Sequence, residues 1–171
     1  MKADLTLPIE GLRPVRIREL KESALCLSYD QRQTHILVDR YEDRSKAIFL
    51  NGKYAFHCFD VDVVHDWKGL ALTEYKIVVD VASAVDSAND WPPLGAITLG
   101  PDGVQLQVAE RDQGFTDRLA LKLGVDLCEI AAGLRVSFSR WAFRFGEGAE
   151  AQSLWIDATA ENEKSRHEVN S

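Results

Sequence analysis

The feature that most constrains this chain is an alternation of apolar and polar residues with a period of two, interrupted by turn-forming residues. In "KAIFLNGKYAFHCF" (residues 46–59), two such runs flank Asn51-Gly52. Asn-Gly is the pair that best tolerates the positive φ angles of a type I′ turn. We therefore expect antiparallel strands at 46–50 and 53–59, closed on this pair. Tyr54, Phe56 and Cys58 then share one face, opposite His57.

Two further stretches show the same alternation. "AITLGPDGVQLQVAE" (residues 96–110) has turn chemistry at 100–103, and its second half alternates apolar residues with glutamine. This pattern predicts a hairpin with one buried face and one solvated face. "TEYKIVVDVAS" (residues 73–83) predicts a strand with Tyr75, Ile77, Val79 and Val81 on one face.

The C-terminal part predicts a third pair of strands within "GLRVSFSRWAFRFGEGAEAQSLWIDA" (residues 133–158). Apolar residues occupy even positions up to Phe138 and odd positions from Trp141, so we expect a β-bulge or corner near Ser139-Arg140. "GEGAE" is the expected turn. The remaining residues, 159–171, contain few apolar side chains and are predicted to form a polar flexible tail.

Two segments fit either secondary structure. Residues 117–133 alternate from Leu119 to Leu127, yet the same leucines also fall on one helical face; we favour a strand to about Val125. Residues 18–31 are ambiguous in the same way, and the strand is again favoured. The sum is a mainly β chain, with a β-rich α+β arrangement still open. We expect a single domain over residues 1–158, an antiparallel sandwich or partly open barrel of about nine or ten strands.

Composition restricts the function and the compartment. The formal net charge of −7 argues against nucleic-acid binding and is compatible with solubility or a basic partner. Arginines 135, 140 and 144 alternate with aromatic residues, and we expect them on the wet side of a strand. The three cysteines, Cys26, Cys58 and Cys128, stand apart among apolar residues, which favours buried reduced thiols. Without a signal peptide or an apolar run of bilayer length, a cytoplasmic protein is expected.

The stretch "FHCFDVDVVHDW" (residues 56–67) concentrates histidine, cysteine and aspartate side chains. A metal-dependent hydrolase using His57, Asp60, Asp62, His65 and Asp66 is one interpretation, but strand parity puts these side chains on different faces. We favour a strand that ends near Asp60 and an acidic loop that carries Trp67 into the core. No catalytic residue, metal site or cofactor is predicted.

Carboxylates and exposed aromatic residues together are typical of a surface that binds a basic protein, because charge steers the encounter and an aromatic side chain anchors it. The predicted binding residues are Asp60, Asp62, Asp66, Trp67, Asp86, Asp90 and Trp91.

The stretch "FLNGKYAFHCFDVDVVHDWKGLALTEYKIVVD" (residues 49–80), a hairpin followed by a Trp-Gly loop and an Ile-Val strand, resembles bacterial immunity proteins. Those proteins are paired with polymorphic or contact-dependent toxins. The resemblance implies a small cytoplasmic inhibitor that binds a toxin domain, often a basic nuclease, and it transfers no functional residue. The alternative is a lipocalin-like barrel that binds a small molecule, with Phe56, Trp141 and Phe143 lining its cavity.

Overall fold

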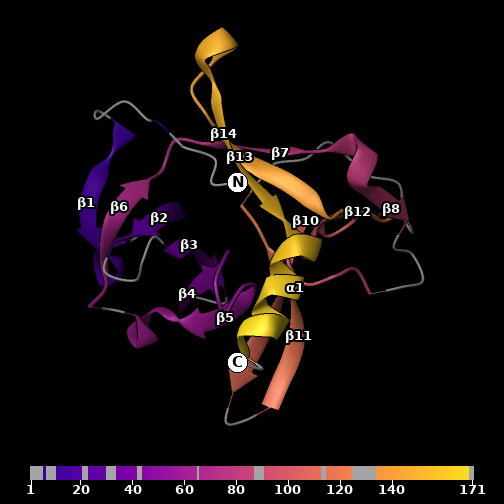
Figure 1. Ribbon diagram of the computed structural model, residues 1–171, viewed down its shortest axis with the longest axis horizontal. Coiled ribbons are helices and arrows are strands. Elements are labelled where there is room, and N and C mark those ends of the chain that lie inside the picture. Colours follow the sequence, from indigo (N-terminus) through magenta and orange to yellow (C-terminus); the bar gives the residue numbers. More distant parts are fainter. Residues whose placement is uncertain are drawn as a thin grey trace.

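The fold is mainly β, as predicted, and it is built from two sheets (Figure 1). The computed structural model describes residue 6 and residues 11–20, 23–29, 34–41, 44–64, 66–86, 91–112, 115–124 and 134–169. Within them lie fourteen strands, eleven in a large sheet and three in a small one. The predicted count was lower because several strands have only three or four residues, too few to show an alternation.

The elements follow one another along the chain with four short 3₁₀ helices between strands. The large sheet contains β1 (Arg13–Arg16), β2 (Ala24–Ser28), β3 (Thr34–Tyr41), β4 (Arg44–Phe49), β5 (His57–Asp60), β6 (Lys68–Leu72), β8 (Ala84–Asp86), β9 (Ile97–Gly100), β10 (Gly103–Asp112), β11 (Phe115–Lys122) and β12 (Val136–Phe138). The small sheet contains β7 (Lys76–Val79), β13 (Arg140–Phe145) and β14 (Gln152–Asp157). The 3₁₀ helices are η2 (Ile17–Glu19), η3 (Val61–Val63), η4 (Val81–Ser83) and η5 (Gly148–Glu150), and α1 (Ala158–Val169) ends the described chain.

Strand β10 joins two parts of the large sheet. One of its edges pairs with β11 over Gln105–Asp112. Its other edge pairs antiparallel with β9 at Gly103–Leu106 and parallel with β5 at Ala109 and Glu110. The strands β1-β6-β2-β3-β4-β5 and β9-β12-β8 therefore meet on the same edge of β10, and the sheet stays open. Among the described strands, the β5–β10 pair is the exception to the predicted antiparallel pairing.

Two hydrophobic clusters lie on opposite faces of β3 and β4. The first contains Leu37 and Ile48 and is covered by the small sheet, from which Trp141 and Phe143 point inward with no exposed surface. The second contains Val38 and is covered by η2 and η3. Because both faces are buried here, "HILV" and "KAIFL" read as nearly continuous apolar runs.

The hairpin of β4 and β5 is antiparallel, as predicted, but its predicted turn is wrong. Ala47 lies opposite Phe59, and residues 50–56 connect the two strands. The backbone N–H of Leu50 donates to the carbonyl of His35 (2.8 Å), and the Asn51 side chain accepts from the His35 N–H (2.8 Å). Asn51 therefore still lies against β3, and the chain reverses only afterwards.

The other two predicted hairpins are confirmed. β9 and β10 are closed by Pro101-Asp102, with Gly103 at φ 100°. Their second face is not solvated, however: Gln107 is 4% exposed, and its amide donates to the hydroxyl of Thr98, itself 3% exposed (3.3 Å). β13 and β14 form the third pair. Both favoured strands are confirmed in part, as β2 and β11; residues 125–133 lie outside the described residues.

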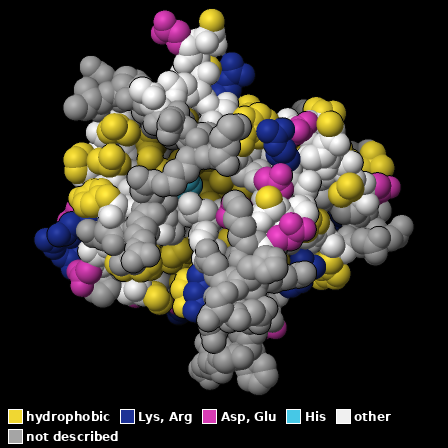
Figure 2. Space-filling view, in the orientation of Figure 1, with side chains coloured by type: hydrophobic (Ala, Val, Ile, Leu, Met, Phe, Trp, Pro, Cys, Tyr) yellow, Lys and Arg dark blue, Asp and Glu magenta, His cyan; other side chains and the backbone are white. Residues whose placement is uncertain are grey.

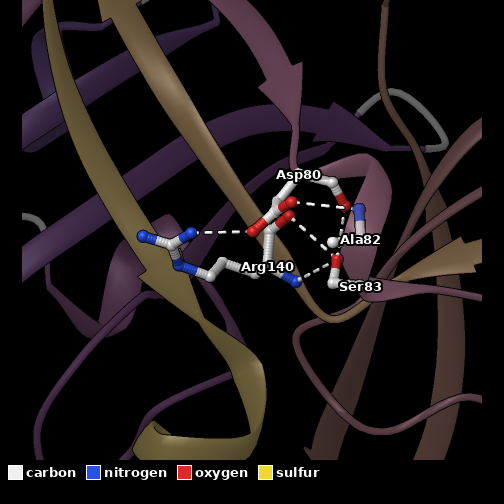
Figure 3. A network of polar contacts seen from close by, with 4 residues as sticks. All are labelled: Asp80, Ala82, Ser83 and Arg140. Atoms are coloured by element: carbon white, nitrogen blue, oxygen red, sulfur yellow. Dashed lines mark hydrogen bonds and ion pairs between the residues drawn. The ribbon is translucent and has the colours of Figure 1, made fainter.

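The predicted corner near Ser139 is where the chain changes sheets, since β12 belongs to the large sheet and β13 to the small one. The connection from β7 to β8 changes sheets at Asp80, and the two crossings are tied together (Figure 3). The Arg140 guanidinium donates to the Asp80 carboxylate (2.7 Å), and the Arg140 backbone N–H donates to the Ser83 hydroxyl (3.1 Å). The hydrogen bond from Arg140, followed by that from the Ala82 N–H, lowers the pKa of Asp80.

The polar stretch predicted as a flexible tail is helical from Ala158 to Val169. Asp157 accepts a hydrogen bond from the N–H of Ala160 (3.0 Å), which is the capping contact of a helix N-terminus. The Asn162 side chain donates to the carbonyl of Leu94 (2.8 Å), so the N-terminal half of the helix is attached to the rest of the fold. In the part of the chain that the structure covers, no helix has the length and apolar character needed to cross a membrane.

Candidate interaction surface

Five aromatic side chains gather on the face of the large sheet that carries the second hydrophobic cluster. We call them the aromatic strip: Phe49, Tyr54, His57, Phe59 and Trp67. Phe49, which is 5% exposed, lies at the centre. Its ring meets those of Phe59 (5.4 Å between centroids), Trp67 (5.6 Å) and Tyr54 (6.1 Å) edge to face.

The rest of the strip is open to solvent to different degrees. Tyr54 is 41% exposed, whereas His57, Phe59 and Trp67 are half-buried. His57 and Phe59 share one face of β5, and Tyr54 joins them from the preceding loop, with centroids 6.3 and 5.9 Å from theirs. The strip therefore lies at the edge of the second hydrophobic cluster, with Phe49 inside the cluster and Tyr54 at the surface.

An acidic segment joins the two ends of the strip. Asp62 and Asp66 are exposed and lie between Phe59 and Trp67 in the chain. Asp66 is 3.6 Å from Arg18, with both side chains largely in water, where such a pair contributes little to stability. Trp67 is held by its backbone, whose N–H donates to Val64 and whose carbonyl accepts from Ile17 (both 3.0 Å). The strand ends at Asp60, as predicted, but the acidic loop places Trp67 half-buried against the second hydrophobic cluster rather than inside it.

Asp60, a predicted binding residue, faces the other side of the sheet. Its carboxylate is 3.1 Å from the ammonium of Lys46, which is 2.6 Å from Glu110. The contact with Asp60 is an ion pair rather than an aligned hydrogen bond. Burial alone would lower the pKa of Lys46, but the hydrogen bond with Glu110 and the negative charges of Glu110 and Asp60 outweigh it and raise that pKa. Asp60 thus helps to join β4, β5 and β10.

The remaining predicted binding residues lie elsewhere. Asp86 is exposed on β8, at the far end of the strand order from β5. Figure 2 shows hydrophobic side chains near this strand, at the right, where Val81 and Val85 are exposed. Trp91 is 68% exposed and lies beside Arg118 of β11, at 5.7 Å. Asp90 lies outside the described residues. Asp62, Asp66 and Trp67 therefore lie in one short segment, whereas Asp60, Asp86 and Trp91 lie apart from it on other faces or strands.

Comparison with known proteins places these elements in a family. The family model described as "Uncharacterised protein y4lG" matches residues 14–165. The chain belongs to the y4lG family. It is 29% identical over 132 residues to the uncharacterized protein y4lG of Sinorhizobium fredii (strain NBRC 101917 / NGR234), an alignment that covers 77% of this chain and 81% of the relative. No solved structure matches. The matched region of this y4lG family member contains the whole aromatic strip.

Sequence reasoning missed Tyr54 and Phe59 as surface residues of the y4lG family member. Their letters stand in the "YAFHCF" stretch, and the alternation correctly puts His57 and Phe59 on one face. The mistaken two-residue turn assigned Tyr54 to the opposite face. Only the longer loop, in which Gly52 (φ 78°) and Phe56 (φ 60°) have positive φ, returns Tyr54 to the side of Phe59.

The other predicted chemistry finds less support in the geometry. Phe56, Trp141 and Phe143, the expected cavity lining of the lipocalin-like alternative, are fully buried. The Trp141 ring contacts Phe143 (5.1 Å), and its N–H donates to Gly95 (2.8 Å). Among the described residues, no group of three or more His, Cys, Asp or Glu side chains is arranged to hold a metal ion. His65 lies outside them.

The thiols behave as packed side chains. Cys26 and Cys58 are free and fully buried, as predicted, whereas Cys128 lies outside the described residues. Burial raises the pKa of Cys26 to about 11 and that of Cys58 to about 12. Both thiols are thus protonated at neutral pH and poor nucleophiles.

Proposed function

We propose that this member of the y4lG family is a protein-binding module whose partner presents a basic surface. One observation carries the proposal: the half-exposed aromatic strip and the exposed carboxylates of Asp62 and Asp66 belong to one continuous segment. Aromatic rings provide large contact areas at low entropic cost, and carboxylates attract lysine and arginine side chains. The net charge of −7 favours encounter with such a partner.

The more specific form of the proposal is that the partner is a toxin domain and the chain its cytoplasmic immunity protein. Its support is the resemblance of residues 49–80 to immunity proteins, together with the acidic character of the chain. Inhibition by binding alone requires no catalytic group of its own. Such a binder needs only a surface that covers or distorts the partner's active site.

The test compares a double carboxylate variant with a single-site control variant. Tagged wild-type protein captures its partner from an extract of the native host, and association rates are then measured with the purified partner. Asp62→Asn combined with Asp66→Asn should slow association several-fold and flatten its salt dependence, because steering by charge is screened over about 10 Å at 0.1 M salt.

Asp86→Asn is the control, since it removes an exposed carboxylate from distant β8. It should leave the association rate near that of wild type. If the double variant, with an unchanged melting temperature, associates as fast as wild type, the partner binds elsewhere. For the specific form, the captured partner should be toxic to cells that lack this protein; a harmless partner would leave only the general binding function.

A further inference from the structure

The most exposed ring of the aromatic strip already has a cation over its face. Tyr54 is 41% exposed, and the Lys53 ammonium lies 5.8 Å from its ring centroid. Lys53 is itself exposed and adjacent in the chain, so its interaction with the ring is weak and easily displaced. A position where the chain supplies its own cation is also a position where another cation can bind.

The Tyr54 ring is held in a defined orientation by its surroundings. The rings of Phe49, His57 and Phe59 all meet it edge to face, at interplanar angles of 65°, 76° and 82°. The loop beneath it is closed by hydrogen bonds from Ala55 to Gly52 (3.0 Å) and from His57 to Tyr54 (2.9 Å). A ring fixed in this way loses little conformational freedom when a ligand binds to it.

We propose that Tyr54, flanked by Phe59 and His57, binds one cationic side chain of the protein partner, and that Lys53 occupies this position in the unbound protein. The inference rests on the proposed function, and it names the chemical group that the surface recognises. The negative face of an aromatic ring attracts a cation and repels a carboxylate. Asp62, three residues after Phe59, adds a negative charge to the same segment.

A pair of labelled peptides tests this directly. One carries ε-trimethyllysine in a glycine-serine sequence, and the other carries the neutral carbon isostere of the same shape. Their affinities for the full chain are measured by fluorescence anisotropy at 0.15 M salt. We expect the charged peptide to bind at least fivefold more tightly, because only the charge distinguishes the two side chains.

Variants assign the difference to the ring. Tyr54→Phe should retain the preference for the charged peptide, whereas Tyr54→Leu, which keeps an apolar side chain without a ring, should abolish it. Lys53→Gln should increase affinity for the charged peptide about two- to fivefold by removing the competing cation. Lys122→Gln, at an exposed position of β11, makes the same change in net charge and should have a smaller effect.

The outcomes separate this inference from the proposed function. Equal affinity for the two peptides, or a preference that survives Tyr54→Leu, would overturn cation binding at Tyr54. If the double aspartate variant still associates more slowly with the captured partner, the proposed function stands without a cation site at Tyr54. In the converse outcome, the charged peptide binds more tightly only when Tyr54 is present, while the double aspartate variant associates as fast as wild type. That result would confirm the cation site and contradict steering by Asp62 and Asp66.

Discussion

The molecule contains two groups of aromatic side chains that differ in their exposure to solvent. The inner aromatic group, Phe56, Tyr75, Trp141 and Phe143, lies between the two sheets, and the aromatic strip lies at the margin of the second hydrophobic cluster. Rings meet edge to face in both, for example Tyr75 with Phe143 (4.9 Å) and Phe49 with Phe59 (5.4 Å). The small sheet packs over the inner group. The second cluster, at whose margin the strip lies, is covered, among the described elements, only by the short 3₁₀ helices η2 and η3.

This comparison shows that ring packing alone does not distinguish core from surface. The inner group has glycine at its centre: a Cβ on Gly95 would lie 2.4 Å from the Phe56 ring, and the Gly95 carbonyl accepts the Trp141 N–H. These contacts allow no additional atom. The strip retains exposed ring surface on Tyr54, so it can still accept a ligand. Three measurements test the distinction.

The largest effect is expected for Gly95→Ala. The new methyl group would overlap the Phe56 ring, and the backbone at φ 84° disfavours any L side chain. We expect a loss of about 3–5 kcal/mol in the free energy of unfolding, measured by chemical denaturation. Gly124→Ala is the control, since nothing lies within 4 Å of its added Cβ. Similar stability of the two variants would show that the inner group is loosely packed.

The second measurement compares one tryptophan from each group. Trp141→Leu removes a ring with no exposed surface and its hydrogen bond to Gly95, which should cost about 3 kcal/mol. Trp67→Leu removes a half-buried ring and should cost about 1 kcal/mol. Both are read from denaturation curves. Equal costs would mean that the strip is core as much as the inner group, which would weaken its assignment as a binding surface.

The smallest effect is expected for the contact between Arg140 and Asp80, which joins the two places where the chain passes from one sheet to the other. Arg140→Gln should lower the melting temperature slightly at pH 7. The folded-state pKa of Asp80 lies below its ordinary value of 3.8, so the stabilisation exists above that value and is lost as the pH falls through the folded-state pKa. The difference from wild type should therefore shrink at about pH 3. Arg144→Gln, exposed on the same strand, should show no such pH dependence; a constant Arg140→Gln deficit would contradict this account.

Local sequence signals predicted the parts of the fold that depend on neighbouring residues. Pro101-Asp102 between alternating runs marked one hairpin, and the parity change at Ser139 marked the transfer between sheets. The helix α1 had a local signal that was overlooked, because Asp157 stands where a capping residue is expected. The candidate surface was only partly predictable: Asp62, Asp66 and Trp67 were identified, but Tyr54 was assigned to the wrong face.

The sequence by itself determined a mainly β protein, since side-chain alternation and turn residues act over a few positions and need no distant partner. Tertiary structure alone decided how the strands combine. Asn51 does not close the predicted turn because it lies against β3, and Asp60 faces the other side of the sheet because Lys46 of β4 pairs there with both Asp60 and Glu110. These arrangements depend on the free energy of contacts between residues far apart in the chain. The alternation of apolar and polar residues along one strand does not indicate which distant strand it contacts.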